Sequence, residues 1–353
     1  MSHEVKPVRF AILLSTYNGE AYLPTLLESI LNQNWKHWDL WIRDDGSTDG
    51  TRDILREFSS RFNGGDEGPN KNTAATTPAG HDAIMPGTSS CRIHNIEGVN
   101  LGIANSFFHL LEKSCDGYDG YAFCDQDDIW VPEKLERAAQ ALEAERPMLY
   151  HARQWIMDED SGKKSLSPRP VHTGFSNALI QNQVVGCTMV INAQLRACVL
   201  ESLQSVLSGE SSGEACRIIM HDWWCYLIAS GTGTICYERD PVILFRRHRQ
   251  STTPAAAGSI SVGRKRLAAF QKLGWSISHI MDQATLLQQF LNNNQPGPAC
   301  QVPDRHRQEL EQLLELRSAG FFKRLGYLFS GRHRRSSLAE TIFFRMLVLL
   351  RRF

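Results

Sequence analysis

Apolar residues at the start of the chain follow two different spacings. The run Phe10–Ser15 is short and continuous, which is typical of a strand buried on both faces, and Asn18 and Gly19 break it. Leucine and isoleucine then recur at i, i+3, i+4, i+7 and i+8 (Leu23, Leu26, Leu27, Ile30 and Leu31), which places one apolar stripe on a helix. Pro24 is tolerated in the first turn of such a helix. A second strand is predicted at Trp38–Arg43.

The alternation of strand and helix continues beyond that point. Ser47–Asp49 are natural caps for a helix whose inner face falls within Ile54–Phe58. A strand at Arg92–Ile96, a helix through Phe107–Leu111 and a strand at Tyr121–Cys124 follow. Because this order is the signature of parallel strands joined by helices, we predict an α/β fold with a mostly parallel central sheet flanked by helices.

One stretch interrupts the pattern. Residues 63–90 are rich in Gly, Pro, Asn, Thr and Ala and have almost no large apolar side chain. Such a segment cannot bury enough surface to offset its chain entropy, so we predict a disordered surface insertion within one domain. We expect that domain to span residues 1–250 and to be followed by a C-terminal helical region over residues 251–353.

Composition narrows the class of protein. The chain has 353 residues, 42% of them hydrophobic, which is enough to bury a sizeable core, and its formal net charge is zero. This balance argues against nucleic acid as a partner. Charge is nevertheless uneven, because residues 321–353 carry eight basic residues against Glu340, a balance of +7. The basic residues are Lys323, Arg324, Arg332, Arg334, Arg335, Arg345, Arg351 and Arg352.

Cysteine usage and hydropathy indicate where in the cell the protein is located. The nine cysteines include no C-x-x-C pair, and several, such as Cys124, Cys187 and Cys236, fall inside apolar runs. This pattern fits reduced thiols and a cytoplasmic location. The first residues lack the pattern of a secretory signal, and no apolar run approaches the roughly 18 residues that span a bilayer.

Polar clusters follow three of the predicted strands. They are Ser15–Asn18, Asp44–Asp45 and Asp125–Asp128. Open parallel sheets bind ligands beyond the carboxyl ends of their strands, and carboxylate oxygens suit Mg²⁺ or Mn²⁺ together with phosphate. The three clusters therefore predict a nucleotide and metal site. The alternative is that the D-x-D triplet within Asp125–Asp128 lies on a solvated loop.

Several common motifs of nucleotide and metal chemistry are missing. The sequence has no G-x-x-x-x-G-K-[ST], which disfavours a P-loop kinase or ATPase. Gly231-Thr232-Gly233 begins like a dinucleotide fingerprint, but the third glycine is absent, so we interpret it as a turn. No H-E-x-x-H or paired Cys and His spacing predicts zinc.

Four stretches resemble a known family when they are taken in order. They are LLSTYNGEAYLPTLLESILNQ and IRDDGSTDGT within residues 8–51, NLGIANSFFHLL at 100–111, and AFCDQDDIWVPEKLE at 122–136. Together they resemble the family-2 inverting glycosyltransferases of GT-A fold. Three further stretches, VVGCTMVIN at 184–192, MHDWW at 220–224 and LFRRH at 244–248, resemble bacterial rhamnosyltransferases that build surface polysaccharides.

The resemblance implies roles for residues at the first two strand ends. Ser15, Thr16 and Tyr17 would bind the nucleotide. Asp45 would accept a hydrogen bond from the pyrimidine NH, because an ionised carboxylate is only an acceptor. Asp44 is the alternative for this role, and whichever of the two does not bind the base would cap the turn.

The resemblance also implies a metal site at the acidic cluster. Asp125 and Asp127 would flank the Mg²⁺ or Mn²⁺ that bridges the donor diphosphate, so Asp125 also counts as a donor-binding residue, and Asp127 would be the direct ligand. Asp128 would cap the turn before Trp130. His248, with two arginines before it, would lie near the diphosphate, although whether it touches metal, phosphate or neither is open.

The resemblance further implies an acidic catalytic base in the MHDWW stretch at 220–224, and Asp222 is the residue predicted for that role. Desolvation among the aromatic residues of His221-Asp222-Trp223-Trp224 would raise its pKa and suit it to accept a proton from the acceptor hydroxyl. The alternative is a helix N-cap ahead of Trp223. Either tryptophan could stack on a sugar or belong to the core. Gly186–Thr188 could line an acceptor pocket or form a plain buried strand.

The basic tail, residues 321–353, allows two interpretations. Its large apolar residues alternate with the cations, so it is either an amphipathic helix on an anionic membrane surface or a helix packed on the catalytic domain with a solvated basic face. Its cations are interleaved with too many large aliphatic residues for a DNA-binding region. A membrane surface would suit a polyprenyl-linked acceptor. The location expected is cytoplasmic, with peripheral attachment to the inner face of the membrane in the first case.

Together these features predict an inverting, metal-dependent glycosyltransferase. The donor favoured by the resemblance is dTDP-rhamnose, and the acceptor is a lipid-linked or growing surface polysaccharide. One alternative keeps the fold and uses UDP-glucose, UDP-galactose or UDP-N-acetylglucosamine. The other is a catalytically silent nucleotide-binding scaffold.

Overall fold

The computed structural model describes residues 7–63, 91–208, 218–248, 277–293 and 297–350. The predicted insertion at 63–90 lies outside the described residues except for Asn63, which ends helix α2 (Thr51–Asn63).

The predicted elements of the first third are present at nearly the predicted positions. The strands are β1 (Phe10–Thr16), β2 (Trp38–Asp44), β3 (Ile93–Glu97), β4 (Gly120–Asp125), β5 (Ile129–Trp130), β6 (Met148–Asp158), β7 (Lys164–Leu166), β8 (Val190–Asn192) and β9 (Thr234–Arg247). The helices of the same part are α1 (Leu23–Leu31), α2, α3 (Ile103–Lys113), α4 (Lys134–Ala141), α5 (Phe175–Ala178), α6 (Ala193–Ser208) and α7 (His221–Thr232). A 3-10 turn, η2 (Gly186–Thr188), precedes β8.

In the described residues the strands form one mixed sheet in the order β3-β2-β1-β4-β8-β6-β9-β5, with β7 paired to β6. Strands β1, β2, β3 and β4 run parallel to one another, as predicted. Strand β8 pairs antiparallel with both β4 and β6. The α/β fold with helices flanking a central sheet is confirmed. Ser15 pairs with Asp125 and Thr16 with Asp44, so the three predicted polar clusters end at one edge.

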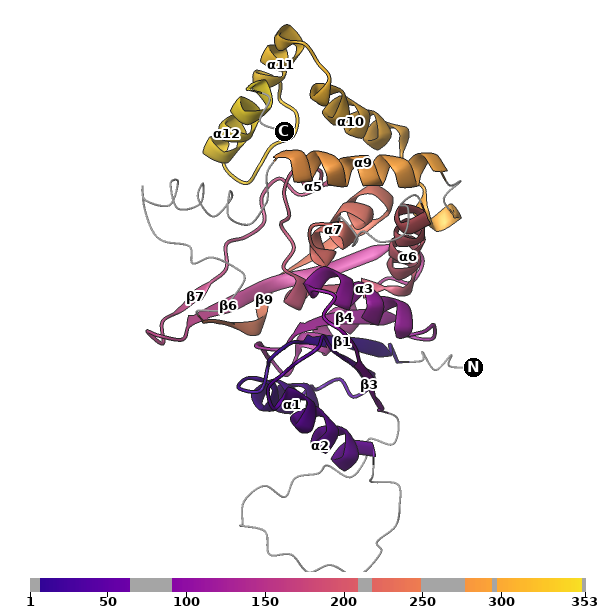
Figure 1. The fold of residues 1–353 in the computed structure, drawn as a ribbon, viewed down its shortest axis with the longest axis vertical. Coiled ribbons are helices and arrows are strands. Elements are labelled where there is room, and N and C mark those ends of the chain that lie inside the picture. The colour runs from indigo at the N-terminus through magenta and orange to yellow at the C-terminus, as the bar shows by residue number, and fades with distance from the viewer. Residues whose placement is uncertain (1–6, 64–90, 209–217, 249–276, 294–296, 351–353) are drawn as a thin grey trace, which may run out of the picture.

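The sheet is buried on both faces. Along β1, Phe10, Ile12 and Leu14 join the core under α1 and α4, whereas Ala11 and Leu13 join the core with α3, α6 and α7. Figure 1 shows α1 and α2 on one side of the sheet and α3, α6 and α7 on the other. This two-sided burial explains why the β1 run is continuously apolar.

The C-terminal extension is helical, as predicted. It contains α9 (Ile277–Asn293), the short turn η3 (Pro298–Cys300), α10 (Asp304–Leu314), the turn η4 (Glu315–Arg317), α11 (Phe321–Leu328) and α12 (Leu338–Leu349). Helix α9 packs on α6, and one hydrophobic core runs from the sheet through α7 and α9 into α12. In Figure 1, α11 and α12 form the end of the molecule opposite α1 and α2.

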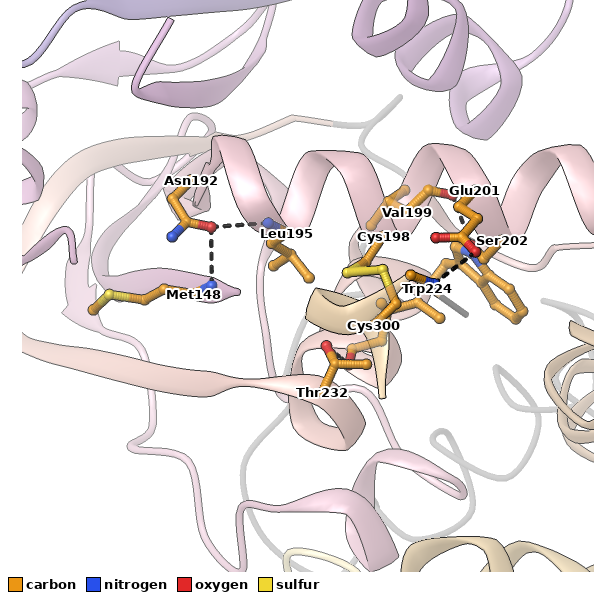
Figure 2. The surroundings of a disulfide bond; sticks show 12 residues. Met148, Asn192, Leu195, Cys198, Val199, Glu201, Ser202, Trp224, Thr232 and Cys300 are labelled. Atoms are coloured by element: carbon orange, nitrogen blue, oxygen red, sulfur yellow. Dashed lines mark hydrogen bonds between the residues drawn. A yellow bond between two sulfur atoms is a disulfide. The ribbon is translucent and has the colours of Figure 1, made fainter. Parts of the chain in front are cut away.

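A disulfide joins the two parts of the chain. Cys198 of α6 is bonded to Cys300 of η3, with a Cα–Cα distance of 5.4 Å and a sequence separation of 102 (Figure 2). The expectation of uniformly reduced thiols is therefore wrong for this pair. Both cysteines are buried, and their spacing in the sequence does not predict that they pair.

None of the described helices has both the length and the apolar character needed to cross a bilayer.

Candidate active site

The first strand end and the acidic cluster are tied together by Gln126. Its side-chain amide donates to the carbonyl of Tyr17 at 2.9 Å, and its Oε1 accepts from the Tyr17 N–H at 2.8 Å. A Cβ on Gly19 would lie 2.4 Å from this same Oε1, so the close approach requires glycine. Gln126 was not predicted, because a lone Gln between two acids gives no signal for a clamp.

Ser15 and Thr16 end β1 with their hydroxyls turned to different neighbours. The Oγ of Ser15 lies 2.6 Å from that of Ser106 in α3. Thr16 is buried, and its hydroxyl lies 3.4 Å from Oδ1 of Asp44. The side chain of Tyr17, directly after β1, is exposed. The roles of these three residues in nucleotide binding stay predictions.

Asp44 caps the turn after β2. Its Oδ2 accepts from the N–H of Ser47 at 3.0 Å and from Arg52 at 2.7 Å. Burial acts to raise its pKa, but the hydrogen bonds from Ser47 and Arg52 outweigh that effect and lower the pKa. Asp44 is therefore held ionised in a structural role, which is the capping alternative considered above.

Asp45 organises the loop that precedes α3. It is buried and accepts from the guanidinium of Arg43, from the N–H of Leu101 at 2.7 Å and from the N–H of Gly102 at 2.9 Å. Gly102 has a φ of +78°, which favours glycine. Oδ2 accepts only the Gly102 bond among these contacts, and a carboxylate oxygen can accept two. The pyrimidine contact predicted for Asp45 stays a prediction.

The acidic cluster contains a buried carboxyl group that no nitrogen or oxygen donor of the described residues satisfies. Asp128 is fully buried, and in the described residues neither of its carboxyl oxygens accepts a hydrogen bond from nitrogen or oxygen. The expectation that it caps the turn is therefore wrong. Burial and the charges of Asp125 and Asp127 raise the pKa of Asp128 well above its usual range. Burial, Asp127 and Asp222 together raise the pKa of Asp125 to about 7.

A buried lysine lies beside this cluster. The Nζ of Lys134 donates to the carbonyl of Cys187 at 2.6 Å and sits 3.3 Å above the ring of Trp130. Burial lowers its pKa to about 8. The sequence did not single out this residue, because a lysine in the first turn of α4 looks like a solvated one.

The donor set fits a divalent cation. Ligand atoms of Asp125, Asp128 and Cys187 lie within 4.8 Å of one another. The carboxylates are hard oxygen ligands of the kind that Mg²⁺ and Mn²⁺ prefer, and a cation would offset the repulsion that raises their pKa values. Cys187 does not fit, because burial raises the pKa of its thiol well above the usual value and keeps it protonated.

Asp127 contacts His248 at the end of β9. The Nε2 of His248 lies 2.8 Å from Oδ2 of Asp127, and its ring stacks on Tyr22 with a centroid distance of 4.7 Å. Arg246 donates to the Asp127 carbonyl at 2.7 Å. The structure therefore brings His248 to the acidic cluster although 121 residues separate it from Asp127. The metal role of Asp127 and the diphosphate role of His248 stay predictions.

Asp222 lies in the first turn of α7, one residue after the helix begins. It is 8% exposed, and it accepts from the N–H of Trp223 at 2.7 Å and from the N–H of Gly186 at 3.2 Å. The N-cap is Met220, so the alternative that Asp222 is the N-cap is wrong. Burial raises its pKa to about 6.

Two aromatic neighbours of Asp222 belong to the core. Trp223 and Trp224 are both buried, and their indole N–H groups donate to Ala178 O at 2.6 Å and to Ser202 Oγ at 2.9 Å. Neither ring is available to stack on a sugar. His221 packs between Phe107 and Phe123, and burial lowers its pKa to about 3, so it is neutral beside Asp222.

The turn η2 connects the predicted base to the acidic cluster. Gly186 donates to Asp222, and the next residue, Cys187, accepts from Lys134 and groups with Asp125 and Asp128. A Cβ on Gly186 would lie 2.8 Å from Nε2 of His221, so this position requires glycine. The region predicted to line the acceptor pocket is a buried 3-10 turn, and its contact with an acceptor stays a prediction.

The comparison with family models gives the class of protein. Residues 11–68, which include β1, α1, β2 and α2, match the model described as Glycosyl transferase family 2. Residues 11–68 therefore carry the family 2 sequence pattern. The resemblance deduced from the motifs is therefore confirmed, and so is the enzyme class.

Known proteins resemble this glycosyltransferase over different lengths. It is 27% identical over 246 residues to a dTDP-rhamnosyl transferase, RfbG of Shigella flexneri, covering 69% of this chain and 74% of RfbG. It is 24% identical over 182 residues to the UDP-Glc:alpha-D-GlcNAc-diphosphoundecaprenol beta-1,3-glucosyltransferase WfgD of Escherichia coli, covering 51% of this chain and 58% of WfgD. A crystal structure of S. aureus TarS 1-349 in complex with UDP-GlcNAc matches with a TM-score of 0.49 and 15% identity, covering 97% of this chain and 82% of that chain.

Proposed function

We propose that this glycosyltransferase is inverting and metal-dependent, and that it transfers rhamnose from dTDP-rhamnose to a lipid-linked or growing surface polysaccharide. The donor sugar is supported by the similarity to RfbG, which is a dTDP-rhamnosyl transferase. A lipid-linked acceptor is supported by the similarity to WfgD, whose acceptor is a diphosphoundecaprenol-linked sugar.

The observation that carries the proposal is the position of Asp222. It is a buried carboxyl with a pKa raised to about 6, and its charge contributes to the raised pKa of Asp125. The predicted base therefore lies close enough to Asp125, a predicted metal ligand, to raise its pKa, although 97 residues separate the two in the sequence. This is the arrangement that a direct displacement needs, because one group must deprotonate the acceptor while another region holds the leaving group.

The proposed transfer takes place in one step. Asp222 accepts the proton of an acceptor hydroxyl, and the oxygen forms a bond to the anomeric carbon of the donor. The bond from that carbon to the diphosphate oxygen breaks, and the nucleoside diphosphate leaves with the electron pair. Attack from the face opposite the diphosphate inverts the anomeric centre, and no covalent intermediate on the protein is required.

Asp125 and Asp127 would hold the Mg²⁺ or Mn²⁺, and Asp128 would add a buried negative charge beside them. When bound, the cation would neutralise negative charge on the diphosphate. His248 holds Asp127 through Oδ2, which orients that carboxylate. Asp45 would bind the pyrimidine ring through Oδ2, which accepts one hydrogen bond, from Gly102.

A product assay on two variants tests this proposal. Asp222→Asn keeps the shape of the side chain but cannot accept the proton, so turnover should fall by a factor of about 10² to 10⁴ while donor binding persists. Asp240→Asn removes an exposed carboxyl in β9 and should leave turnover unchanged. Equal turnover in Asp222→Asn and the wild type would refute the base, and donor binding without any turnover in the wild type would identify a silent scaffold.

A second donor class is favoured by one of the relatives. WfgD is named as using UDP-glucose, so UDP-glucose, UDP-galactose and UDP-N-acetylglucosamine form the alternative panel. A bound donor raises the melting temperature by mass action. Thermal shift with Mn²⁺ across dTDP-rhamnose and the three UDP-sugars should show the largest rise for dTDP-rhamnose, and a larger rise for any UDP-sugar would replace it.

The proposed location is the cytoplasm, at the inner face of the membrane. The Cys198–Cys300 disulfide stands against a reducing compartment, where such bonds are rare. Both cysteines are buried, which would slow their reduction without preventing it. The redox state of this pair in cells therefore tests the location separately from the reaction.

A further inference from the structure

The last helix of the described chain, α12, carries large apolar residues on both its buried and its exposed face. Its buried face holds Thr341, Phe344, Arg345 and Val348, spaced as one stripe on a helix. Its opposite face, exposed in the structure, holds large apolar residues at i, i+4, i+5, i+8 and i+12 (Leu338, Ile342, Phe343, Met346 and Leu350). A helix that is apolar all round is normally covered on every side, by protein or by lipid.

Three arginines of the basic tail are turned inward. Arg324, Arg335 and Arg345 are buried. Arg335 donates to the carbonyl of Ile180 at 2.7 Å, which docks the tail on the catalytic part, and Arg345 donates to the carbonyls of Leu328 and Arg332. Both sequence-based interpretations of the tail, which assumed an exposed basic face, are therefore wrong about these three cations.

Helix α11 and the residue after it extend the exposed apolar surface. Phe321, Phe322 and Phe329 are 55%, 84% and 80% exposed. We define the apolar cap as these three residues together with Leu338, Ile342, Phe343, Met346 and Leu350. Figure 1 shows that the two helices that carry it form one end of the molecule, where a flat surface could reach them.

Three exposed cations belong to the same segment as the apolar cap, and one of them, Lys323, is ion-paired with Glu315 at 2.6 Å. Lys323, Arg332 and Arg334 are exposed in the same segment, and among described residues 321–350 there is no exposed acidic residue, since Glu340 is half-buried. Exposed phenylalanine and leucine with basic residues at the edge is the composition of surfaces that enter the lipid headgroup region. The long basic side chains can reach phosphates while the rings lie deeper.

We propose that the apolar cap inserts into the interface of an anionic lipid bilayer. A second copy of the chain is a poorer occupant, because a two-fold interface would bring Lys323, Arg332 and Arg334 of both copies together. Lipid phosphates complement those same charges. The driving force differs from the one predicted by the sequence: apolar side chains carry the attachment, and the exposed cations add preference for anionic lipid. The proposal does not depend on the donor sugar or on the transfer reaction.

Flotation of the full-length chain with vesicles tests the proposal. The wild type should float with neutral phosphatidylcholine vesicles and better when phosphatidylglycerol is added, and only the added binding should weaken at high salt. The triple variant Phe322→Ser, Phe329→Ser, Leu338→Ser changes highly exposed residues, so it should fold normally and lose at least about tenfold in partition to both vesicles. The variant Lys323→Gln, Arg332→Gln, Arg334→Gln should lose only the preference for anionic vesicles.

The controls separate binding from folding and from self-association. Leu166→Ser with Val171→Ser, two exposed apolar residues outside the apolar cap, should float like the wild type. The proposal would be overturned if the apolar triple variant floated as well as the wild type. It would also be overturned if the cation variant lost its binding to neutral vesicles and kept its binding to anionic ones. It would also be overturned if the wild type did not float and instead formed a dimer in sedimentation that the apolar triple variant lost.

Discussion

The acidic loop after β4 and the arginines of the C-terminal helices both bury charge, but they satisfy that charge differently. Asp128 is fully buried with no hydrogen bond to its carboxyl from nitrogen or oxygen among the described residues, and burial with like charges raises its pKa. Arg335 and Arg345 are buried with backbone carbonyls as acceptors. A buried carboxyl group among like charges fits a cation-binding site, whereas the paired arginines stabilise the fold.

The largest expected effect comes from removing a metal-binding charge at the acidic loop. Asp127→Asn should lower turnover by a factor of about 10³, because a cation supplies several kcal/mol of charge stabilisation. The rise in melting temperature that Mn²⁺ gives the wild type should also disappear. Asp240→Asn is the matched control and should keep both properties. An unchanged Mn²⁺ shift in Asp127→Asn would show that the cation binds elsewhere.

The disulfide between Cys198 and Cys300 provides a test of how the C-terminal extension is held to the catalytic part. It closes a loop of 102 residues, and such a link contributes roughly 2–4 kcal/mol to the free energy of unfolding. The double variant Cys198→Ser, Cys300→Ser should unfold at a lower denaturant concentration by that amount, while reductant should have no effect on it. If the wild type and the double variant unfold together without reductant, the two thiols are not bonded in solution.

A smaller effect is expected from a single buried arginine. Arg335→Met removes the donor to the Ile180 carbonyl and should lower the free energy of unfolding by about 1–3 kcal/mol, because a buried acceptor loses its partner. Arg332→Met, at an exposed position of the same tail, is the matched control and should change it little. An equal loss in both variants would mean that Arg335 does not anchor the tail.

The pH dependence should reveal the base. Only ionised Asp222 can accept a proton, so with saturating Mn²⁺ turnover should fall about tenfold per pH unit below its pKa of about 6. The folded chain binds this proton more tightly than the unfolded chain, where the pKa is near 3.8. The stability contributed by protonated Asp222 is therefore present below about pH 4 and is lost as pH rises through about 6.

Asp222→Asn provides the control for that profile. Its residual turnover should not change between pH 5 and 7, and at pH 7.5 its melting temperature should be no lower than that of the wild type, because a buried charge has been removed. A residual turnover with the same acid limb as the wild type would assign the titration to another group.

The sequence predicted the parts of the site that depend on local pattern. Apolar runs located β1, β2 and β4, and parallel pairing then placed Ser15, Asp44 and Asp125 at one edge. The contacts of Gln126 and Lys134 could not be predicted, because they are set by distant parts of the chain. In α12 both faces are apolar enough to be buried, so the sequence pattern alone could not predict which face packs inward.

The most direct test of the account is a crystal structure with a nucleoside diphosphate and Mn²⁺ bound. We expect Mn²⁺ between the diphosphate and the carboxylates of Asp125 and Asp127, and the pyrimidine near Asp45. We expect Asp222 to face the open side where the acceptor enters. A diphosphate bound away from this edge of the sheet, or Asp222 closed off from the bound donor, would contradict it.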